Sequence, residues 1–125
     1  MPFIKKDEAP TFATPNAVMV QYAGPSRGSA ELSMWQVQLE PAAAGPVHVI
    51  DREQVYLVTA GSMIIMAASE ESQPQAGDTV IIPAGALRQI RNQGDSAARA
   101  IVCMPAGGQV TMPDGESRGL LPWAT

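Results

Sequence analysis

The sequence has little of several residue types on which common functions depend. Its one cysteine, Cys103, cannot form an internal disulfide or a multi-thiolate metal site, which excludes disulfide-stapled scaffolds and zinc fingers. Eight Lys and Arg residues stand against twelve Asp and Glu residues, for a formal net charge of -4 at pH 7. Because nucleic acids and anionic membranes attract basic surfaces, we expect neither as a partner.

Long apolar runs are also missing. No stretch approaches the roughly 18 apolar residues of a membrane-spanning helix, and none follows the lysines near the N-terminus as in a signal peptide. We therefore expect a cytoplasmic protein. Only 16% of the residues are charged and 46% are hydrophobic, which is not the composition of a disordered chain. The 125 residues fit a single domain, 1–125, with one hydrophobic core.

The chain is rich in the turn-forming residues glycine and proline. Eleven Gly and eleven Pro residues are spread over its length and leave few intervals long enough for an average helix. Residues of high β-propensity fill those intervals and predict eight strands, at residues 17–23, 30–39, 47–50, 54–60, 62–68, 79–82, 87–92 and 98–104. Short strands separated by turns are typical of an all-β sandwich or barrel.

The barrel core is predicted at about residues 17–104, with short irregular arms at residues 1–16 and 105–125. The C-terminal arm carries Trp123, a large aromatic residue. This arm is expected to cover a groove or a neighbouring subunit, or Trp123 caps its own barrel. Cys103 lies in an apolar strand and is expected to be a small buried residue.

Segment 77–92 combines a glycine turn, an apolar strand, a Pro-x-Gly corner and a strand that ends at an asparagine turn. It resembles the second conserved motif of the cupin superfamily, G(x)5PxG(x)2H(x)3N. The match covers Gly77, Pro83, Gly85 and Asn92, whereas Arg88 stands where that motif has histidine. The spacing of these four residues makes the resemblance specific.

A second, partial match lies upstream, where the first cupin motif reads roughly HxH(x)3-4E(x)6G. His48 falls on its first histidine and Gly61 on its glycine, while Ile50 replaces the second histidine and Gln54 the glutamate, with Glu53 beside it. The resemblance spans about residues 30–104. It implies a jelly-roll β-barrel of the small single-domain type, with degenerate metal-binding motifs.

The resemblance also indicates which metal ligands of the cupin site this chain lacks. Cupins hold one divalent metal through three histidines and one glutamate, but Ile50 has no lone pair and Arg88 is a permanent cation that only donates hydrogen bonds. We therefore expect no bound cofactor. If a divalent metal does bind, we expect His48 to hold it with Gln54 or Glu53.

A pocket for a small molecule is the alternative use of the barrel mouth. Strand alternation places Gln54 and Tyr56 on one face, taken here as the pocket face. The substrate-binding residues are then predicted to be Gln54, Tyr56, Trp35, Ile50 and Ile90. An apolar lining with a few convergent polar groups is the usual form of a small-molecule site.

Two residues of this pocket are predicted to be catalytic. Arg88 would bind an anion or stabilise developing negative charge, and His48 would be the general acid or base. Together they predict metal-independent proton transfer on an anionic or enolisable organic substrate, of the isomerase, cyclase or lyase type. Two other functions stay open: a non-catalytic ligand-binding barrel, and a metal-dependent enzyme with an unusual ligand set.

Structural roles are open for the same residues. Arg88 could form a surface ion pair with Asp51 or Glu53, and His48 could be an ordinary residue of the barrel rim. The run Asp51-Arg52-Glu53 is expected to be a solvated turn. Cupins commonly pair through a sheet face, and the apolar strands of this chain lead us to expect a homodimer.

Overall fold

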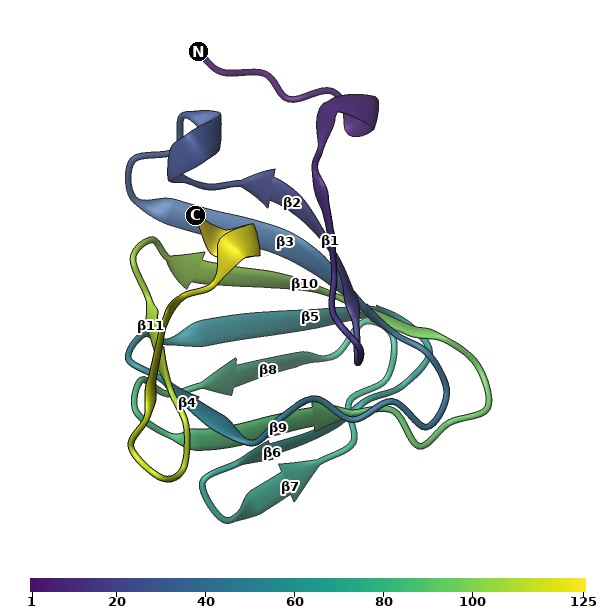
Figure 1. The fold of residues 1–125 in the computed structure, drawn as a ribbon. Helices are drawn as coiled ribbons and strands as arrows, with labels where there is room; N and C mark the ends of the chain where they lie inside the picture. Colours follow the sequence, from purple (N-terminus) through teal and green to yellow (C-terminus); the bar gives the residue numbers. More distant parts are fainter.

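The computed structural model describes all 125 residues, which form two antiparallel six-stranded sheets facing each other (Figure 1). The first sheet has the order β1-β2-β3-β10-β5-β8 and contains β1 (Thr11–Ala13), β2 (Val18–Ala23), β3 (Leu32–Leu39), β5 (Gln54–Ala60), β8 (Thr79–Ile82) and β10 (Ala98–Pro105). The second has the order β12-β11-β4-β9-β6-β7 and contains β4 (His48–Ile50), β6 (Ile64–Ala67), β7 (Glu70–Ser72), β9 (Leu87–Arg91), β11 (Gln109–Thr111) and β12 (Ser117–Leu120).

The core lies between the two sheets. Along β5, buried residues alternate with more exposed ones, and β10 shows the same pattern. Val58 and Val102 are fully buried at the centre of these strands. Such alternation is what a strand needs when only one of its faces packs on a core.

The eight strands predicted from the sequence are confirmed, and the fold class is all-β. Four short strands were not predicted: β1, β7, β11 and β12. Three of them, β1, β11 and β12, lie in the segments expected to be irregular arms. These segments have little β-propensity of their own, and pairing with neighbouring strands orders them. The expected burial of Cys103 is wrong, because it occupies an outward position of β10 and is exposed.

The glycine and asparagine of the segment 77–92 have structural roles. Gly85 adopts a φ of 79° and donates its N–H to the carbonyl of Ile50 (2.9 Å), which fixes the corner between β8 and β9 against the end of β4. The amide of Asn92 donates to the carbonyls of Leu39 and Ser96 and accepts from the N–H of Gly94. These contacts hold both ends of β9, the strand that carries Arg88.

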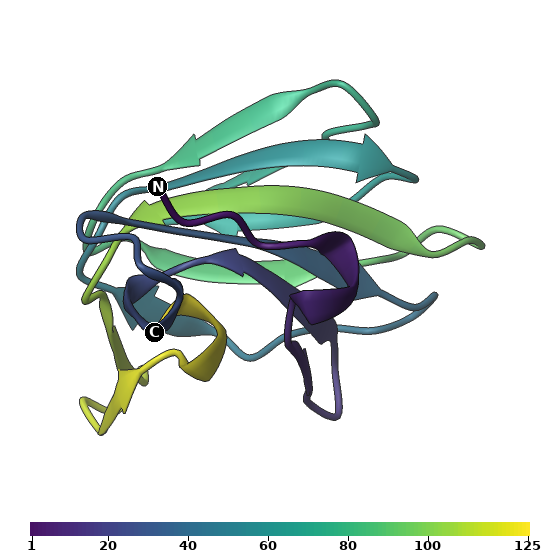
Figure 2. The same ribbon diagram turned by 90° about the horizontal axis from the view of Figure 1, so that it is seen from above.

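The C-terminal segment crosses one end of the barrel and finishes in the 3-10 turn η3 (Pro122–Ala124), beside η2 (Pro25–Arg27) (Figure 2). The N–H of Ser26 donates to the carbonyl of Thr125, and the Ser33 hydroxyl donates to the carbonyl of Ala124. Trp123 packs against the core of its own barrel, as one of the two interpretations proposed. The remaining 3-10 turn is η1 (Lys6–Glu8), and no helix has the length and apolarity to cross a bilayer.

Candidate functional site

A cavity of about 570 Å³ opens into the barrel between the two sheets. Nineteen residues line this cavity, and twelve of them are hydrophobic. The lining residues are Thr14, Asn16, Ala17, Met19, Trp35, Val37, Leu39, Gly45, Pro46, His48, Ile50, Gln54, Tyr56, Ile90, Val110, Met112, Arg118, Leu121 and Trp123. A smaller cleft of about 270 Å³ beside β6 is lined by seven residues, none of them titratable. We therefore place the candidate site in the larger cavity, called the barrel cavity below.

His48 is the one histidine of the chain, and it lines the barrel cavity. Its Nδ1 lies 2.8 Å from the carbonyl oxygen of Pro46, and because a carbonyl only accepts, Nδ1 carries the hydrogen. Burial lowers the pKa of His48 from its usual value near 6.5; the bond to Pro46 opposes this shift, and the charge of Arg88 adds to it. At neutral pH the imidazole is neutral, with its lone pair on Nε2.

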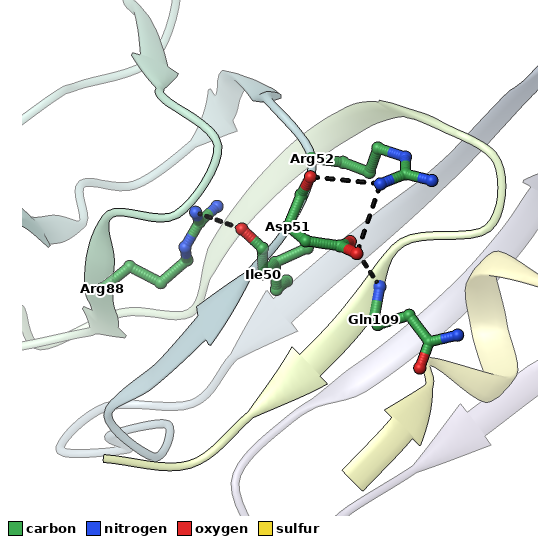
Figure 3. Close-up of polar contacts among 5 residues, drawn as sticks. All are labelled: Ile50, Asp51, Arg52, Arg88 and Gln109. Carbon is green, nitrogen blue, oxygen red and sulfur yellow. Dashed lines mark hydrogen bonds and ion pairs between the residues drawn. The ribbon is translucent and has the colours of Figure 1, made fainter. Parts of the chain in front are cut away.

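Arg88 stands directly opposite His48, on the neighbouring strand β9, but it is fully buried. Its Nε donates to the carbonyl of Ala86 (3.1 Å), and its Nη2 donates to the carbonyls of Pro83 (2.9 Å) and Ile50 (3.2 Å). Figure 3 shows the bond to Ile50. Arg88 does not line the barrel cavity, so the expectation that its guanidinium faces the pocket is corrected: it lies behind the cavity wall.

The fourth bond of Arg88 reaches a cavity residue. Its Nη1 donates to Gln54 Oε1 at 2.7 Å. Since a guanidinium has only donors, this contact fixes which end of the Gln54 amide faces Arg88. Gln54 and Tyr56 both line the barrel cavity from the inner face of β5, as predicted.

No carboxylate compensates the charge of Arg88. Asp51 pairs with Arg52 (3.2 Å) and accepts from the N–H of Gln109 (2.7 Å), in a cluster that Figure 3 shows turned away from the guanidinium. Glu53 is exposed. The proposed surface ion pair of Arg88 with either acid is therefore wrong, while the solvated turn at 51–53 is confirmed.

The pKa values of this cluster follow from burial. Desolvation lowers the pKa of Arg88, and the neighbouring Tyr56 opposes that shift. Burial raises the pKa of Tyr56 to about 12, with the charge of Arg88 acting in the other direction. Tyr56 is therefore a neutral hydroxyl at physiological pH.

The remaining predicted residues, Trp35, Ile50 and Ile90, line the barrel cavity as well. The terminal segments supply further lining residues that sequence reasoning missed, namely Thr14, Asn16, Ala17, Val110, Met112, Arg118 and Leu121. Trp123 was the one signal in the sequence that the C-terminal segment closes the barrel. The guanidinium of Arg118 lies at the rim, where it pairs with Glu116 at 3.3 Å.

The residues present do not fit the metal that this fold commonly holds. The structure contains no group of three or more His, Cys, Asp or Glu side chains able to share an ion. At the four motif positions, Ile50 offers no donor atom, Arg88 is a cation, and Gln54 Oε1 already accepts from that cation. His48 is left as the one ligand, whereas such sites need three or four.

Comparison with known families identifies the chain. A family model described as a cupin domain matches residues 35–104, and the chain belongs to the cupin family. The predicted fold, an all-β cupin jelly-roll barrel, is confirmed. In the sequence comparison with curated proteins, no protein matches this chain.

Solved structures of low sequence identity share the fold. The polyketide cyclase RemF from Streptomyces resistomycificus is 16% identical with a TM-score of 0.75, and the match covers 97% of this chain and 86% of that chain. A predicted oxalate decarboxylase from Thermotoga maritima is 13% identical with a TM-score of 0.73, covering 82% and 97%. An oxalate oxidase is 20% identical with a TM-score of 0.67; the match covers 80% of this chain but only 56% of the oxidase chain.

Proposed function

We propose that this cupin binds a small organic molecule in the barrel cavity and moves a proton on it, with His48 as general base and no metal taking part. The observation that carries this proposal is the state of His48. Its Nδ1–H donates to Pro46, its pKa is lowered by burial, and it lines an otherwise largely apolar cavity. A neutral imidazole with a free Nε2 is suited to accept a proton near neutral pH.

The substrate class follows from the lining. Trp35, Ile50 and Ile90 would bind the apolar body of the molecule, and Gln54 and Tyr56 would orient its polar group. An enolisable carbonyl compound fits, and an anionic substituent could extend to Arg118 at the rim. Isomerisation, cyclisation and elimination each begin with such a proton transfer. The likeness of fold to the polyketide cyclase RemF supports testing cyclisation first.

The experiment is a binding screen of enolisable ketones and small carboxylates, followed by exchange of their α-protons for deuterium, monitored by NMR. We expect His48→Ala to slow exchange of a bound compound by about 10²- to 10⁴-fold, the usual contribution of a general base. His48→Gln is the matched variant, because its amide can still donate to Pro46 but is no base. Equal exchange rates in wild type and both variants would contradict the proposal.

The same experiment distinguishes the alternative function. In a non-catalytic ligand-binding barrel, a compound would bind with similar affinity to wild type and His48→Ala, and the protein would not accelerate its exchange. Binding without exchange across the whole screen would therefore favour the ligand-binding barrel over the enzyme.

We also propose that two copies of the chain pair through the outer face of the first sheet. The strand register places Leu57, Ile101 and Leu32 on that face, together with Ile81 of β8. Leu32 and Ile81 are each 60% exposed. Exposed apolar residues on one face of a sheet support an interface there. Sedimentation should give twice 13.1 kDa at micromolar concentration and a monomer for Ile81→Lys; a wild-type monomer would contradict the pairing.

A further inference from the structure

Arg88 is a buried cation that lacks a counter-ion. Its guanidinium is fully buried and is solvated by three backbone carbonyls and one amide oxygen, all of them neutral. Asp51, which follows the Arg88 partner Ile50, and Glu53, which precedes its partner Gln54, are exposed, and Asp51 is paired with Arg52. A buried charge is costly unless an opposite charge offsets it, so an uncompensated cation behind a cavity wall favours negative charge inside the cavity.

Gln54 is the wall residue between that cation and the barrel cavity. Arg88 Nη1 donates a hydrogen bond to Gln54 Oε1. The other end of the Gln54 amide, Nε2, has no hydrogen-bond partner within the protein. The Gln54 side chain lines the cavity. Among fully enclosed side-chain nitrogen and oxygen atoms, only Gln21 Nε2 lacks a hydrogen-bond partner, so Gln54 Nε2 is not fully enclosed. Gln54 Nε2 is therefore accessible from the cavity as a hydrogen-bond donor.

Tyr56 supplies a second donor. It lies two residues further along β5 on the same face, it lines the barrel cavity, and its hydroxyl bonds no other residue. Its hydroxyl keeps the proton at physiological pH because of its burial. Two neutral donors and one imidazole lone pair thus belong to residues that line the same, largely apolar cavity.

We infer that Gln54 Nε2 and Tyr56 Oη form an oxyanion site for a neutral, enolisable ketone, with Arg88 as the positioning residue that orients and polarises Gln54 from behind. This inference rests on the proposed function and names its substrate class. Hydrogen-bond donors that face a carbonyl oxygen stabilise the negative charge that develops on it during the reaction. Arg88 thereby supplies, through Gln54, the positive field that a metal ion supplies in other sites.

The chemistry balances with the groups present. His48 Nε2 takes a proton from the carbon next to the ketone, the C–H bond breaks, and its electron pair moves to the carbonyl oxygen to form an enolate held by Gln54 and Tyr56. The imidazolium then returns the proton to the same carbon, which exchanges that hydrogen, or to the far end of a dienolate where a C=C bond is conjugated with the enolate. In the alternative outcome the enolate carbon attacks a second carbonyl carbon of the same molecule, the new C–C bond forms as the C=O π pair becomes an alkoxide, and the imidazolium gives its proton to that alkoxide. Neither outcome needs an oxidant, a reductant or a co-reactant.

The test uses 4-nitrophenol as a probe of the oxyanion site, because its neutral and ionised forms have different absorption spectra. A titration of the bound probe against pH gives the preference of the cavity for phenolate over phenol. We expect at least about tenfold tighter binding of the phenolate, which is one pKa unit of the probe. Repeating the titration in His48→Ala excludes proton uptake by the imidazole, and the preference should persist there.

Three variants locate the source of the preference. Gln54→Leu should abolish it, and Tyr56→Phe should reduce it several-fold, while both keep Arg88 in place. Arg88→Met should abolish it wherever that variant folds. Arg99→Met is the matched control, since it removes an exposed guanidinium of β10 and should leave the preference unchanged.

Two results would overturn the inference. One is a bound probe that ionises as it does in water. The other is a phenolate preference that survives Gln54→Leu and disappears in Arg118→Gln, which would move anion recognition to the rim. In either case α-proton exchange that depends on His48 can still be observed, so the failure of the oxyanion site is distinguishable from the failure of the proposed function.

Discussion

Two polar clusters meet at Gln54, and they differ in how completely their hydrogen bonds are made inside the protein. Behind the cavity wall, Arg88 uses four of its N–H groups on Ala86, Pro83, Ile50 and Gln54. On the cavity side, Gln54 Nε2 and the hydroxyl of Tyr56 have no protein partner, although both residues are at least nine-tenths buried.

The difference assigns different tasks to the two sides. A buried polar group without a partner costs roughly 1–3 kcal/mol, so a fold built for stability alone would satisfy it. The Arg88 cluster follows that rule and ties the β8–β9 corner to β4. The cavity groups instead leave their donors open to the barrel cavity, where a ligand would complete their hydrogen bonds under the proposed function.

Removing Arg88 should give the largest loss of stability. Arg88→Met removes one donor from each of three carbonyls and from Gln54 Oε1, and we expect the free energy of unfolding to fall by about 3 kcal/mol. Urea denaturation measures this fall. The matched control is Arg99→Met, which removes an exposed guanidinium and should cost less than about 1 kcal/mol.

Equal losses for the two arginine variants would contradict the division between the clusters. Arg88→Lys sharpens the test, because it keeps the charge but cannot reproduce the planar fork that reaches Pro83 and Ile50 together. We expect its stability to lie between those of wild type and Arg88→Met.

The fold could be predicted largely from the sequence, for a physical reason. Prolines and glycines mark the turns, and the alternation of Gln54, Tyr56 and Val58 marks the inner face of β5. The short strand β11 escaped prediction because it is created by pairing with β4, a contact distant in sequence, and β12 escaped because it pairs in turn with β11. Cys103 was misplaced because an apolar strand does not reveal which of its faces is solvated.

The site could be predicted only in part. Motif positions led to His48, Gln54 and Tyr56, all of which line the barrel cavity. Arg88 occupies a motif position too, but the length of its side chain carries the guanidinium to the carbonyls of Pro83 and Ala86, which no spacing reveals. Arg118 was missed because the C-terminal segment reaches the cavity through tertiary contacts alone.

The pH dependence of His48 gives a smaller effect that belongs to the cavity side. Because the pKa of His48 is lowered by burial, the imidazole stays neutral to a lower pH than a free imidazole, so the rate should fall only as the pH drops through that lowered pKa. His48 is the single histidine of the chain, so its NMR titration is free of overlap. A rate that falls as the pH rises, or one whose midpoint differs from the NMR midpoint of His48, would argue against His48 as the base.

The smallest expected effect is that of added metal. Cupin motif positions bring Ile50 and Arg88 where ligands would be needed, and the guanidinium repels a divalent cation, so His48 alone cannot hold one tightly. Plasma mass spectrometry of untagged protein, after incubation with Mn, Fe, Ni or Zn and desalting, should find well below one equivalent, and α-proton exchange should not change. Near one equivalent of a single metal, lost in His48→Ala and in Gln54→Leu, would contradict this expectation. It would mean that Gln54 leaves Arg88 to become a metal ligand, so that the Arg88 cluster loses a hydrogen-bond partner to the cavity side.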